Sequence, residues 1–370
     1  MKAEEKYYRK LVEGYLNKTL TKRELTIFFD LLSKGVLDFY LEEDMVANVP
    51  ESVAIIKPKR RLRSWYSLAA SVLLLIGLGL GFFYMKSTPV ETGQSTAREV
   101  RPGGNQAILT LSNGEQVILD DLEQAEEIHE RNVSIVNNKS GSIQYDLSKI
   151  NIEGVEKAQL AKKFNTIETP RGGTYQIILP DGSKVWLNSL SKIKFPLVFS
   201  DTQRIVEMDG EAFFDIAENR KQPFIVKSRN QEIEVLGTSF NVNSYNDEPF
   251  IRTTLLTGRI QLSSPYTSLQ LTPGQEILNN NGELKVQSAD VEQAIAWKDG
   301  YFRFDKADVS SLMRQISRWY NVNVKFIGRV SEERFVGKIK RSGSLDELLK
   351  IFKDGGMDVS LTGRTITVRN

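Results

Sequence analysis

The chain has 370 residues, a formal net charge of +2, no cysteine and one histidine. The lack of cysteine excludes disulfides, thiol catalysis and cysteine-ligated metal, and a single histidine does not by itself build a histidine-based zinc site or a catalytic triad. The sequence has no phosphate-binding loop and no dinucleotide-binding fingerprint, and its charge does not favour direct nucleic-acid binding. We therefore expect a protein that is not an enzyme and that has no cofactor.

Residues 1–45 are predicted to form short amphipathic helices. A first apolar stripe at helical spacing comprises Tyr8, Leu11, Val12, Tyr15 and Leu16. Thr21 and Glu24 then form a capping-box pattern, and a second stripe comprises Leu25, Phe28, Phe29 and Leu32. So short a segment buries these stripes poorly. It is either a minimal bundle or a bundle that keeps part of its apolar surface for a partner protein.

An uncharged segment of 21 residues, Trp65–Met85, follows a linker over residues 46–64. About 20 helical residues cross the ~30 Å hydrocarbon core of a bilayer, so this segment is predicted to span the lipid bilayer. Basic residues gather just before it, at Lys57, Lys59, Arg60, Arg61 and Arg63. This asymmetry predicts that residues 1–64 lie in the cytoplasm and residues 86–370 on the other side.

The periodicity changes from helical to alternating at residue 100. Two β-rich runs flank Asn113-Gly114, and the same layout returns around Asp181-Gly182; both dipeptides are typical of two-residue hairpin turns. The two hairpins are related by a constant offset of 68 residues. Residues 100–295 are therefore predicted to form a β-rich domain of stacked units around a shared core.

Three features of this domain have a structural interpretation. Arg171-Gly172-Gly173 is predicted to let the chain bend tightly between strands, and Trp186 is predicted to lie in the core. Alternation over residues 209–215 points Glu211 and Phe213 to one face of a strand. The carboxylates of that run therefore do not gather into a catalytic or calcium-binding cluster.

Residues 296–370 are predicted to form a compact α+β module, because a strand–helix–strand pattern occurs twice. The buried stripes of its two helices comprise Val309, Leu312, Met313 and Ile316, and then Leu345, Leu348, Leu349 and Phe352. Asp308 and Ser344 are suitable N-caps for these helices.

Together these segments predict a multi-domain single-pass membrane protein. Its fold class combines a small all-α cytoplasmic domain over residues 1–45, a basic juxtamembrane linker over 46–64, one transmembrane helix over 65–85 and a periplasmic linker over 86–99. An all-β domain, solenoid-like or sandwich-like, follows over residues 100–295, and an α+β module with a doubled βαβ plan over 296–370.

Four runs of this sequence resemble the FecR family of membrane anti-sigma factors, in the form common in Bacteroidetes. They are TPRGGTYQIILPDGSKVWLNSLSKIKFP, RIVEMDGEAFFDIAENRKQPFIV, EVLGTSFNVNSY and FRFDKADVSSLMRQISRWYNVNV. The resemblance implies an inner-membrane protein with no enzymatic activity. It also implies that the cytoplasmic tail binds an extracytoplasmic-function sigma factor. The periplasmic region would sense the signalling domain of a TonB-dependent outer-membrane receptor, through a C-terminal module similar to the secretin and TonB short N-terminal module.

Candidate contact residues follow from this hypothesis. Sigma-factor binding is assigned to apolar stripe residues of the tail, namely Leu11, Tyr15, Leu25, Phe28 and Phe29. Receptor contact is assigned to the C-terminal module, at Arg314, Arg318, Thr365, Thr367 and Arg369. Of two candidate edge strands, residues 322–326 and 365–369, the second is favoured because it ends the chain and no later strand can cover it.

Two other classes of function compete with this one. A membrane-anchored periplasmic β-rich protein that binds glycans would use Trp186, Trp297 and Trp319 as stacking residues, but it leaves the cytoplasmic helices without a role. A membrane-tethered hydrolase would need a clustered pair of carboxylic acids, which the sequence does not indicate.

Overall fold

The computed structural model describes residues 100–119, 126–130, 133–138, 142–146 and 154–369 as segments. In the N-terminal part it describes single residues: Tyr7, Tyr8, Lys10, Leu11, Thr19, Thr21, Glu24, Ile27 and Leu31. The chain divides into two compact units, Met1–Pro89 and Val90–Asn370. All the sheets and helices considered below belong to the second unit.

The predicted fold class is wrong. The described chain is mostly β-sheet with few helices, because alternating strand-forming runs dominate it, and no helix among the described residues is long and apolar enough to cross a membrane. The helical domain expected over residues 1–45 is described only at single positions, and residues 46–99, with the span expected over 65–85, lie outside the described residues. Within the N-terminal part, the capping box is present, since the Thr21 amide donates to Glu24 (2.9 Å) and the Glu24 amide to Thr21 Oγ1 (3.4 Å).

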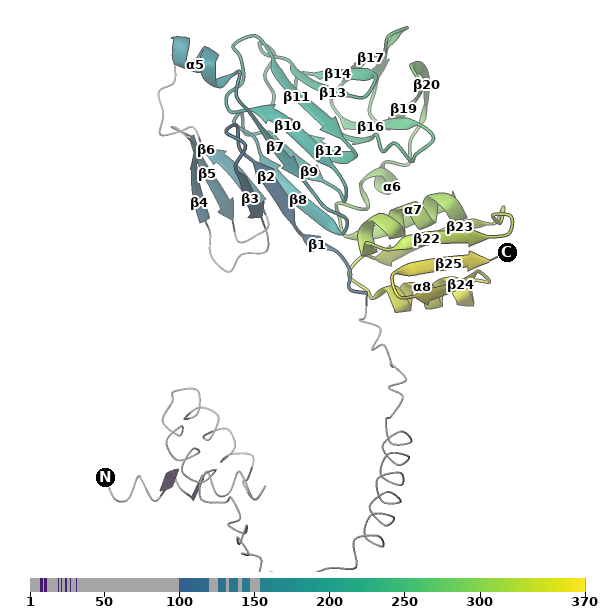
Figure 1. Ribbon diagram of the computed structural model, residues 1–370. Coiled ribbons are helices and arrows are strands. Elements are labelled where there is room, and N and C mark those ends of the chain that lie inside the picture. The colour runs from purple at the N-terminus through teal and green to yellow at the C-terminus, as the bar shows by residue number, and fades with distance from the viewer. Residues whose placement is uncertain are drawn as a thin grey trace, which may run out of the picture. The chain divides into compact units, whose positions relative to one another are not determined.

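Two sheets build the β-domain over residues 104–288, which we call the sandwich (Figure 1). The larger sheet contains β1 (Gly104–Asn105), β4 (Glu126–Glu130), β5 (Val133–Asn138), β6 (Ser142–Asp146), β8 (Gly173–Ile178), β9 (Lys184–Leu187), β12 (Glu211–Asp215), β15 (Ser239–Asn243), β16 (Ile251–Thr257), β19 (Gln275–Asn280) and β20 (Glu283–Ser288). The second contains β2 (Ala107–Thr110), β3 (Gln116–Leu119), β7 (Phe164–Glu168), β10 (Lys192–Pro196), β11 (Arg204–Asp209), β13 (Phe224–Ser228), β14 (Gln231–Val235), β17 (Ile260–Ser263) and β18 (Ser268–Leu271). A short helix, α5 (Gly154–Leu160), lies between β6 and β7 in the chain.

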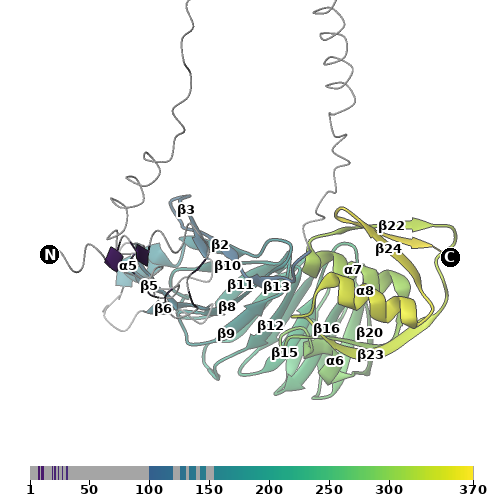
Figure 2. The ribbon, with the colours of Figure 1, turned by 90° about the horizontal axis from the view of Figure 1, so that it is seen from below.

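From β8 onward the chain passes back and forth between the two sheets, adding one or two strands to each in turn. Strands β13 and β14 join the second sheet, β15 and β16 the larger one, and β17 and β18 the second again. Figure 2 shows the result, in which strands follow one another along the length of the sandwich from β3 toward β20. Neighbouring strands are therefore close in sequence, which makes most of the pairing local.

The hairpins expected from the turn dipeptides are confirmed. β2 pairs with β3 around Asn113-Gly114, and β8 pairs with β9 around Asp181-Gly182. The structure adds a third hairpin of this kind, β19 with β20, around Asn281-Gly282. Each turn glycine has a positive φ, between 81° and 103°, a backbone conformation that costs a side chain about 1–2 kcal/mol. The turn chemistry thus sets the register of these strands.

A single apolar core lies between the two sheets. Alternation in β14 buries every second residue, Gln231, Ile233 and Val235, while its two glutamates are exposed. Phe214 and Phe240, both fully buried, stack with ring centroids 5.0 Å apart. Burying one such side chain contributes about 1.5–3 kcal/mol, so the rows of inward residues along the sandwich hold the sheets together.

Helix α6 (Val291–Ile295) leads into the C-terminal module, residues 301–369, which lies beside the sandwich in Figure 1. Its elements in chain order are β21 (Tyr301–Asp308), α7 (Val309–Tyr320), β22 (Asn323–Ile327), β23 (Arg334–Lys340), α8 (Leu345–Asp354), β24 (Asp358–Thr362) and β25 (Thr365–Arg369). The two predicted N-caps are confirmed, because Asp308 accepts from the Ser311 amide and Ser344 forms a capping box with Glu347. Both predicted helix stripes are buried in a second core.

Strand β25 is not an edge. It pairs in parallel with β22 and antiparallel with β24, so it is the middle strand of a three-stranded sheet. The expectation that residues 365–369 offer a free edge fails because two earlier strands, β22 and β24, pair with the two sides of β25. The edges of this sheet are β22 and β24.

Candidate functional site

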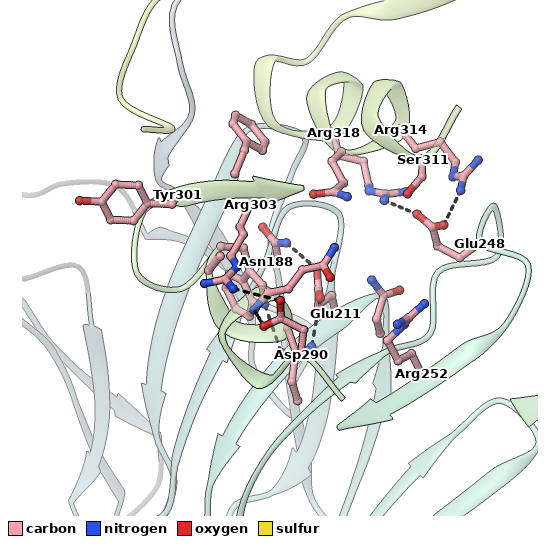
Figure 3. Close-up of a pocket in the computed structure, with 18 of the residues that line it drawn as sticks. Asn188, Glu211, Glu248, Arg252, Asp290, Tyr301, Arg303, Ser311, Arg314 and Arg318 are labelled. Atoms are coloured by element: carbon pink, nitrogen blue, oxygen red, sulfur yellow. Dashed lines mark hydrogen bonds and ion pairs between the residues drawn. The ribbon is translucent and has the colours of Figure 1, made fainter. Parts of the chain in front are cut away.

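The outer face of the larger sheet meets the C-terminal module around a polar cavity of about 300 Å³. Glu211, on β12, lines the cavity from the sheet, and Arg314 and Arg318, on α7, line it from the module (Figure 3). Asn241, on β15, also lines it from the sheet. Glu211 and Phe213 do point to the face opposite the sandwich core, as alternation predicts, since Ala212 and Phe214 belong to that core. That outer face is covered, however, and Glu211 is only 9% exposed.

Two amide side chains hold the Glu211 carboxylate. Asn188 Nδ2 donates to one oxygen (2.7 Å) and Asn241 Nδ2 to the other (3.1 Å). Each amide is oriented through its own oxygen, because Asn241 Oδ1 accepts from Trp297 Nε1 and Asn188 Oδ1 accepts from the Ser189 amide. Both therefore present donors to Glu211, which suits an acceptor with two oxygens.

Burial raises the pKa of the Glu211 carboxyl, while the hydrogen bonds from Asn188 and Asn241 and the charges of Arg318 and Arg341 act in the opposite direction. Desolvation is the largest of these effects, as is usual for a carboxyl removed from water. Glu211 is thus a buried acid whose charge is supported by groups from both the sandwich and the C-terminal module.

Arg341, in the turn between β23 and α8, is 4% exposed and joins the module to the sandwich. Its guanidinium lies 3.9 Å from the ring centroid of Trp319 and donates to Asn188 Oδ1 (3.1 Å) and to the Trp297 carbonyl (3.2 Å). Burial lowers the pKa of Arg341 to about 10, so the side chain stays charged at neutral pH. The same Asn188 therefore contacts Glu211 with its nitrogen and Arg341 with its oxygen.

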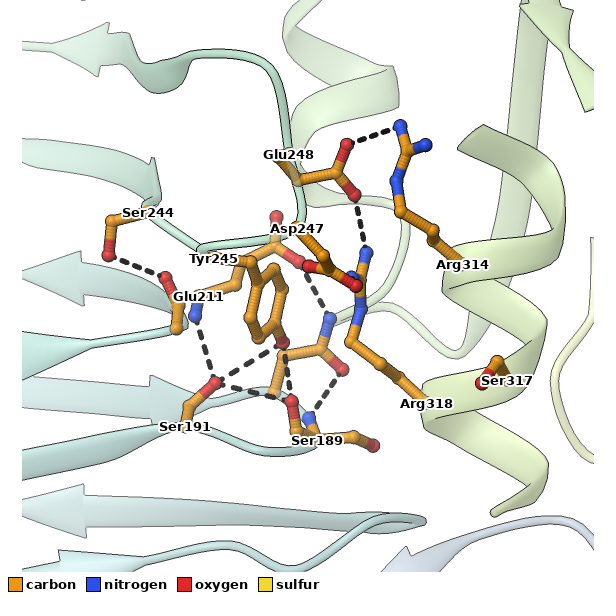
Figure 4. A network of polar contacts seen from close by, with 12 residues as sticks. Ser189, Ser191, Glu211, Ser244, Tyr245, Asp247, Glu248, Arg314, Ser317 and Arg318 are labelled. Carbon is orange, nitrogen blue, oxygen red and sulfur yellow. Dashed lines mark hydrogen bonds and ion pairs between the residues drawn. The ribbon is translucent and has the colours of Figure 1, made fainter. Parts of the chain in front are cut away.

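Arg318 is the second buried cation of this contact, at 5% exposure. It reaches from α7 to the loop after β15, where it donates to both oxygens of Asp247 (2.8 and 2.9 Å) and to Glu248 (2.6 Å), as Figure 4 shows. Arg314, one turn earlier on the helix, donates to the other oxygen of Glu248 (2.7 Å). The Arg318 guanidinium also lies 4.0 Å from the ring centroid of Tyr245.

These contacts correct the placement of two predicted receptor-contact residues. Arg314 and Arg318 were predicted to contact a receptor, but both form ion pairs with the sandwich, and Arg318 is buried. The helix stripe predicted which face packs on the module's own core; it held no information about a second domain beside the helix. Thr365 and Thr367 lie on the central strand β25, where Arg369 donates to Ser360 Oγ (3.0 Å).

Of the predicted sigma-contact residues, Leu11 is described and is 3% exposed. Tyr15, Leu25, Phe28 and Phe29 lie outside the described residues, as do the basic residues of the juxtamembrane linker. Among the described residues, no group of histidine and acidic side chains is arranged to hold a metal ion.

The three tryptophans among the described residues are engaged in contacts within the chain and do not form a sugar platform. Trp319 is 7% exposed and donates to the Arg341 carbonyl (2.8 Å), and Trp297 donates to Asn241. Trp186 is half-buried on the outer face of β9, where Phe213 packs against its ring and Lys298 lies 5.2 Å from its centroid. The prediction that Trp186 lies in the core is wrong, because Val185 and Leu187 take the inward positions of that strand.

Glu211, Asn188, Asn241 and Arg341 were not predicted as site residues. Three of them lie in runs that carry the family resemblance, in KVWLNS, DGEAFFD and TSFNVN, and that was the available signal. No sequence signal pointed to Arg341, because only the tertiary fold brings it close to Asn188, about 150 positions earlier in the chain.

Replacing Arg318 by alanine should lower the free energy of unfolding of residues 90–370 by about 2–4 kcal/mol, because Asp247 and Glu248 lose their principal donor. Arg220→Ala is the matched control: it removes an ion pair whose partners are 81% and 68% exposed, and should have no measurable effect. Denaturant titration measures both. Equal losses in the two variants would contradict a structural role for Arg318 beyond that of a surface ion pair.

The raised pKa of Glu211 predicts a pH-dependent difference in stability between the natural chain and Glu211→Gln. The folded state binds the proton of the Glu211 carboxyl more tightly than an unfolded chain does, in which its pKa is 4.5. Protonated Glu211 therefore contributes fully to the free energy of unfolding below that pH. This contribution to the free energy of unfolding is lost as the pH rises through the raised pKa of Glu211. Thermal unfolding from pH 4 to 8 should show the natural chain losing stability relative to the variant with rising pH. An opposite slope would show that the amides and arginines outweigh burial.

Comparison with known proteins is consistent with this arrangement of two folded parts. Residues 165–261 match the family described as FecR protein, and residues 301–368 match the one described as FecR, C-terminal. A crystal structure of an assigned anti-sigma factor from Parabacteroides distasonis, at 1.65 Å resolution, is 29% identical, with a TM-score of 0.52, over 55% of this chain and 97% of its own. A second, at 2.50 Å, gives the same identity and TM-score over 56% and 99%. No curated protein matches the chain. The chain therefore contains both segments that the FecR family models describe, and these segments contact each other through Arg318 and Arg341.

Proposed function

We propose that this chain regulates a sigma factor. The observation that carries the proposal is the presence of both FecR segments in one compact unit, together with the similarity to the Parabacteroides distasonis protein that is assigned as an anti-sigma factor. The described geometry supports a binding protein rather than an enzyme. Its charged centre is engaged within the chain, since Glu211, Arg318 and Arg341 each bond to partners across the contact between sandwich and module.

The sigma factor in this proposal is of the extracytoplasmic-function class and binds the N-terminal part of the chain. The support for this proposal is the pair of apolar stripes in residues 1–45. Together they present more apolar surface than so short a segment can bury within itself. An amphipathic helix that lays such a stripe into a groove contacts its partner through residues spaced at i, i+3 and i+4. Of the five predicted contacts, Tyr15, Leu25, Phe28 and Phe29 are the proposed ones, whereas Leu11 is already buried, at 3% exposure.

Tyr15→Glu and Phe28→Glu should each abolish co-purification of the sigma factor with the full-length chain, because a carboxylate cannot enter an apolar groove without a large desolvation cost. Lys10→Glu, at a position that is exposed, is the control and should retain binding. Circular dichroism accompanies the assay and should be unchanged. Retained binding in both variants, or a collapse of helicity, would remove these residues from the contact.

On the other side, we propose that the C-terminal module contacts the signalling domain of a TonB-dependent outer-membrane receptor. This places residues 86–370 in the periplasm of a bacterium and the N-terminus in the cytoplasm, at the inner membrane; the basic residues at positions 57–63 support that orientation. The edge strand β22 is the proposed contact, since it is paired on one side only, to β25, and Lys325 and Phe326 are exposed on it. A partner strand added there gains main-chain hydrogen bonds.

A single cysteine at Lys325 tests both location and contact, because the natural chain has no cysteine. In cells with a permeabilised outer membrane, Lys325→Cys should react with a membrane-impermeant maleimide, and the purified receptor signalling domain should protect it. Lys10→Cys is the matched control and should not react until the inner membrane is opened. Labelling of Lys10→Cys in intact inner membranes contradicts the orientation, and labelling of Lys325→Cys that the receptor domain does not reduce contradicts the contact.

A further inference from the structure

A short segment at the start of the sandwich contributes to both folded parts of the second unit. Val100 is 2% exposed and belongs to the core of the C-terminal module, together with Phe302 and Trp319. Four residues later, β1 pairs in parallel with β8, and the Gly104 amide donates to the Gly172 carbonyl (2.8 Å). We call residues 100–105 the strap. It is the segment through which residues 1–99 connect to everything that follows.

Glycine is required where the strap crosses between the two parts. A Cβ atom at Gly103 would lie 2.2 Å from the Gly172 carbonyl oxygen and 2.7 Å from the Trp319 ring, distances at which no side chain fits. A Cβ atom at Gly104, the next residue, would meet nothing within 4 Å. A side chain is therefore excluded at position 103, between the sandwich and the module, but has room at position 104.

The Arg171-Gly172-Gly173 run is the other half of this junction. Gly172, with φ +77°, accepts from the strap through its carbonyl and donates through its amide to the Arg318 carbonyl on α7 (2.8 Å). Arg171 donates to Ser317 Oγ (3.0 Å). The tight bend expected from the sequence thus has a second role, because one loop of the sandwich bonds to the strap on one side and to the last turn of α7 on the other.

We propose that the strap couples the C-terminal module to the N-terminal part of the chain. A displacement of α7 from the sandwich breaks its bond to Gly172 and withdraws the core in which Val100 is buried, so the strap keeps only its pairing with the sandwich and is loosened together with the module. A change at the module then reaches residue 99 along six residues, without a rearrangement inside the sandwich. This inference rests on the proposed function for its meaning in regulation, but the coupling itself is a property of the fold.

Coupling between two sites is reciprocal, which gives the test two directions. In hydrogen exchange on the full-length chain, Gly103→Ala should speed exchange of amides in α7 and β21 by about tenfold or more. Arg318→Ala, a change on the module, should in turn speed exchange of the Gly104 and Gln106 amides of the strap region. Gly104→Ala is the matched control, one residue away and with room for its methyl group, and should change neither. Natural exchange rates in Gly103→Ala, or equal effects of the two glycine variants, overturn the coupling.

A crosslink keeps the test decisive if Gly103→Ala unfolds the module. Asn105 and Thr174 are register partners on β1 and β8, so cysteines at both positions are placed for a disulfide, and the natural chain offers no competing thiol. The oxidised form should slow exchange of α7 amides relative to the reduced form, and equal rates overturn the proposal.

Transcription from a sigma-dependent promoter separates this inference from the proposed function. Gly103→Ala should change uninduced transcription at least threefold and Gly104→Ala should not. If Tyr15→Glu and Phe28→Glu leave transcription as in the natural chain, the proposed function fails while the exchange results stand. If those two variants act and Gly103→Ala does not, the strap carries no signal.

Discussion

The placement of the C-terminal module against the sandwich depends on charged side chains that are largely removed from water. An unpaired buried guanidinium or carboxylate costs several kcal/mol, and Glu211, Arg318 and Arg341 escape that cost only when the two parts are in contact, because their supporting groups come from both. Asn188 illustrates the constraint, since its side-chain amide donates to the Glu211 carboxylate of the sandwich and accepts from the Arg341 guanidinium of the module. Hydrogen-bond geometry of this kind fixes an orientation more sharply than apolar area does, because a few tenths of an ångström decide whether a bond forms.

The same constraint shapes the surroundings of the three charges. Trp319 and Tyr245 cover guanidinium planes with ring faces, an arrangement that keeps water out while favouring the cation. The loop after β15 carries two adjacent acidic residues, Asp247 and Glu248, and the long side chains of α7 reach them. Polar groups thus set the contact between the two folded parts, while each part holds itself together by an apolar core of its own.

Local signals in the sequence predicted local structure well. Asn-Gly and Asp-Gly marked hairpin turns, Asp308 and Ser344 marked helix starts, and the stripe at Val309, Leu312 and Ile316 identified the buried face of α7. Each of these depends on residues within a few positions of one another. The order of strands in a sheet does not, and so the central place of β25 was missed. The burial of Arg318 and Glu211 was missed for the same reason, because alternation tells which way a side chain points but not what covers it.

The burial of Val100 in the core of the C-terminal module has a consequence for the order in which the protein acquires its structure. Strands of the sandwich pair mainly with near neighbours in sequence, so they can assemble progressively as the chain is delivered. Val100 precedes them all, yet its binding site does not exist until α7 and β21, some two hundred residues later, have formed. The earliest described segment of this unit is therefore among the last to reach its native contacts, and a chain halted before residue 301 leaves it without them.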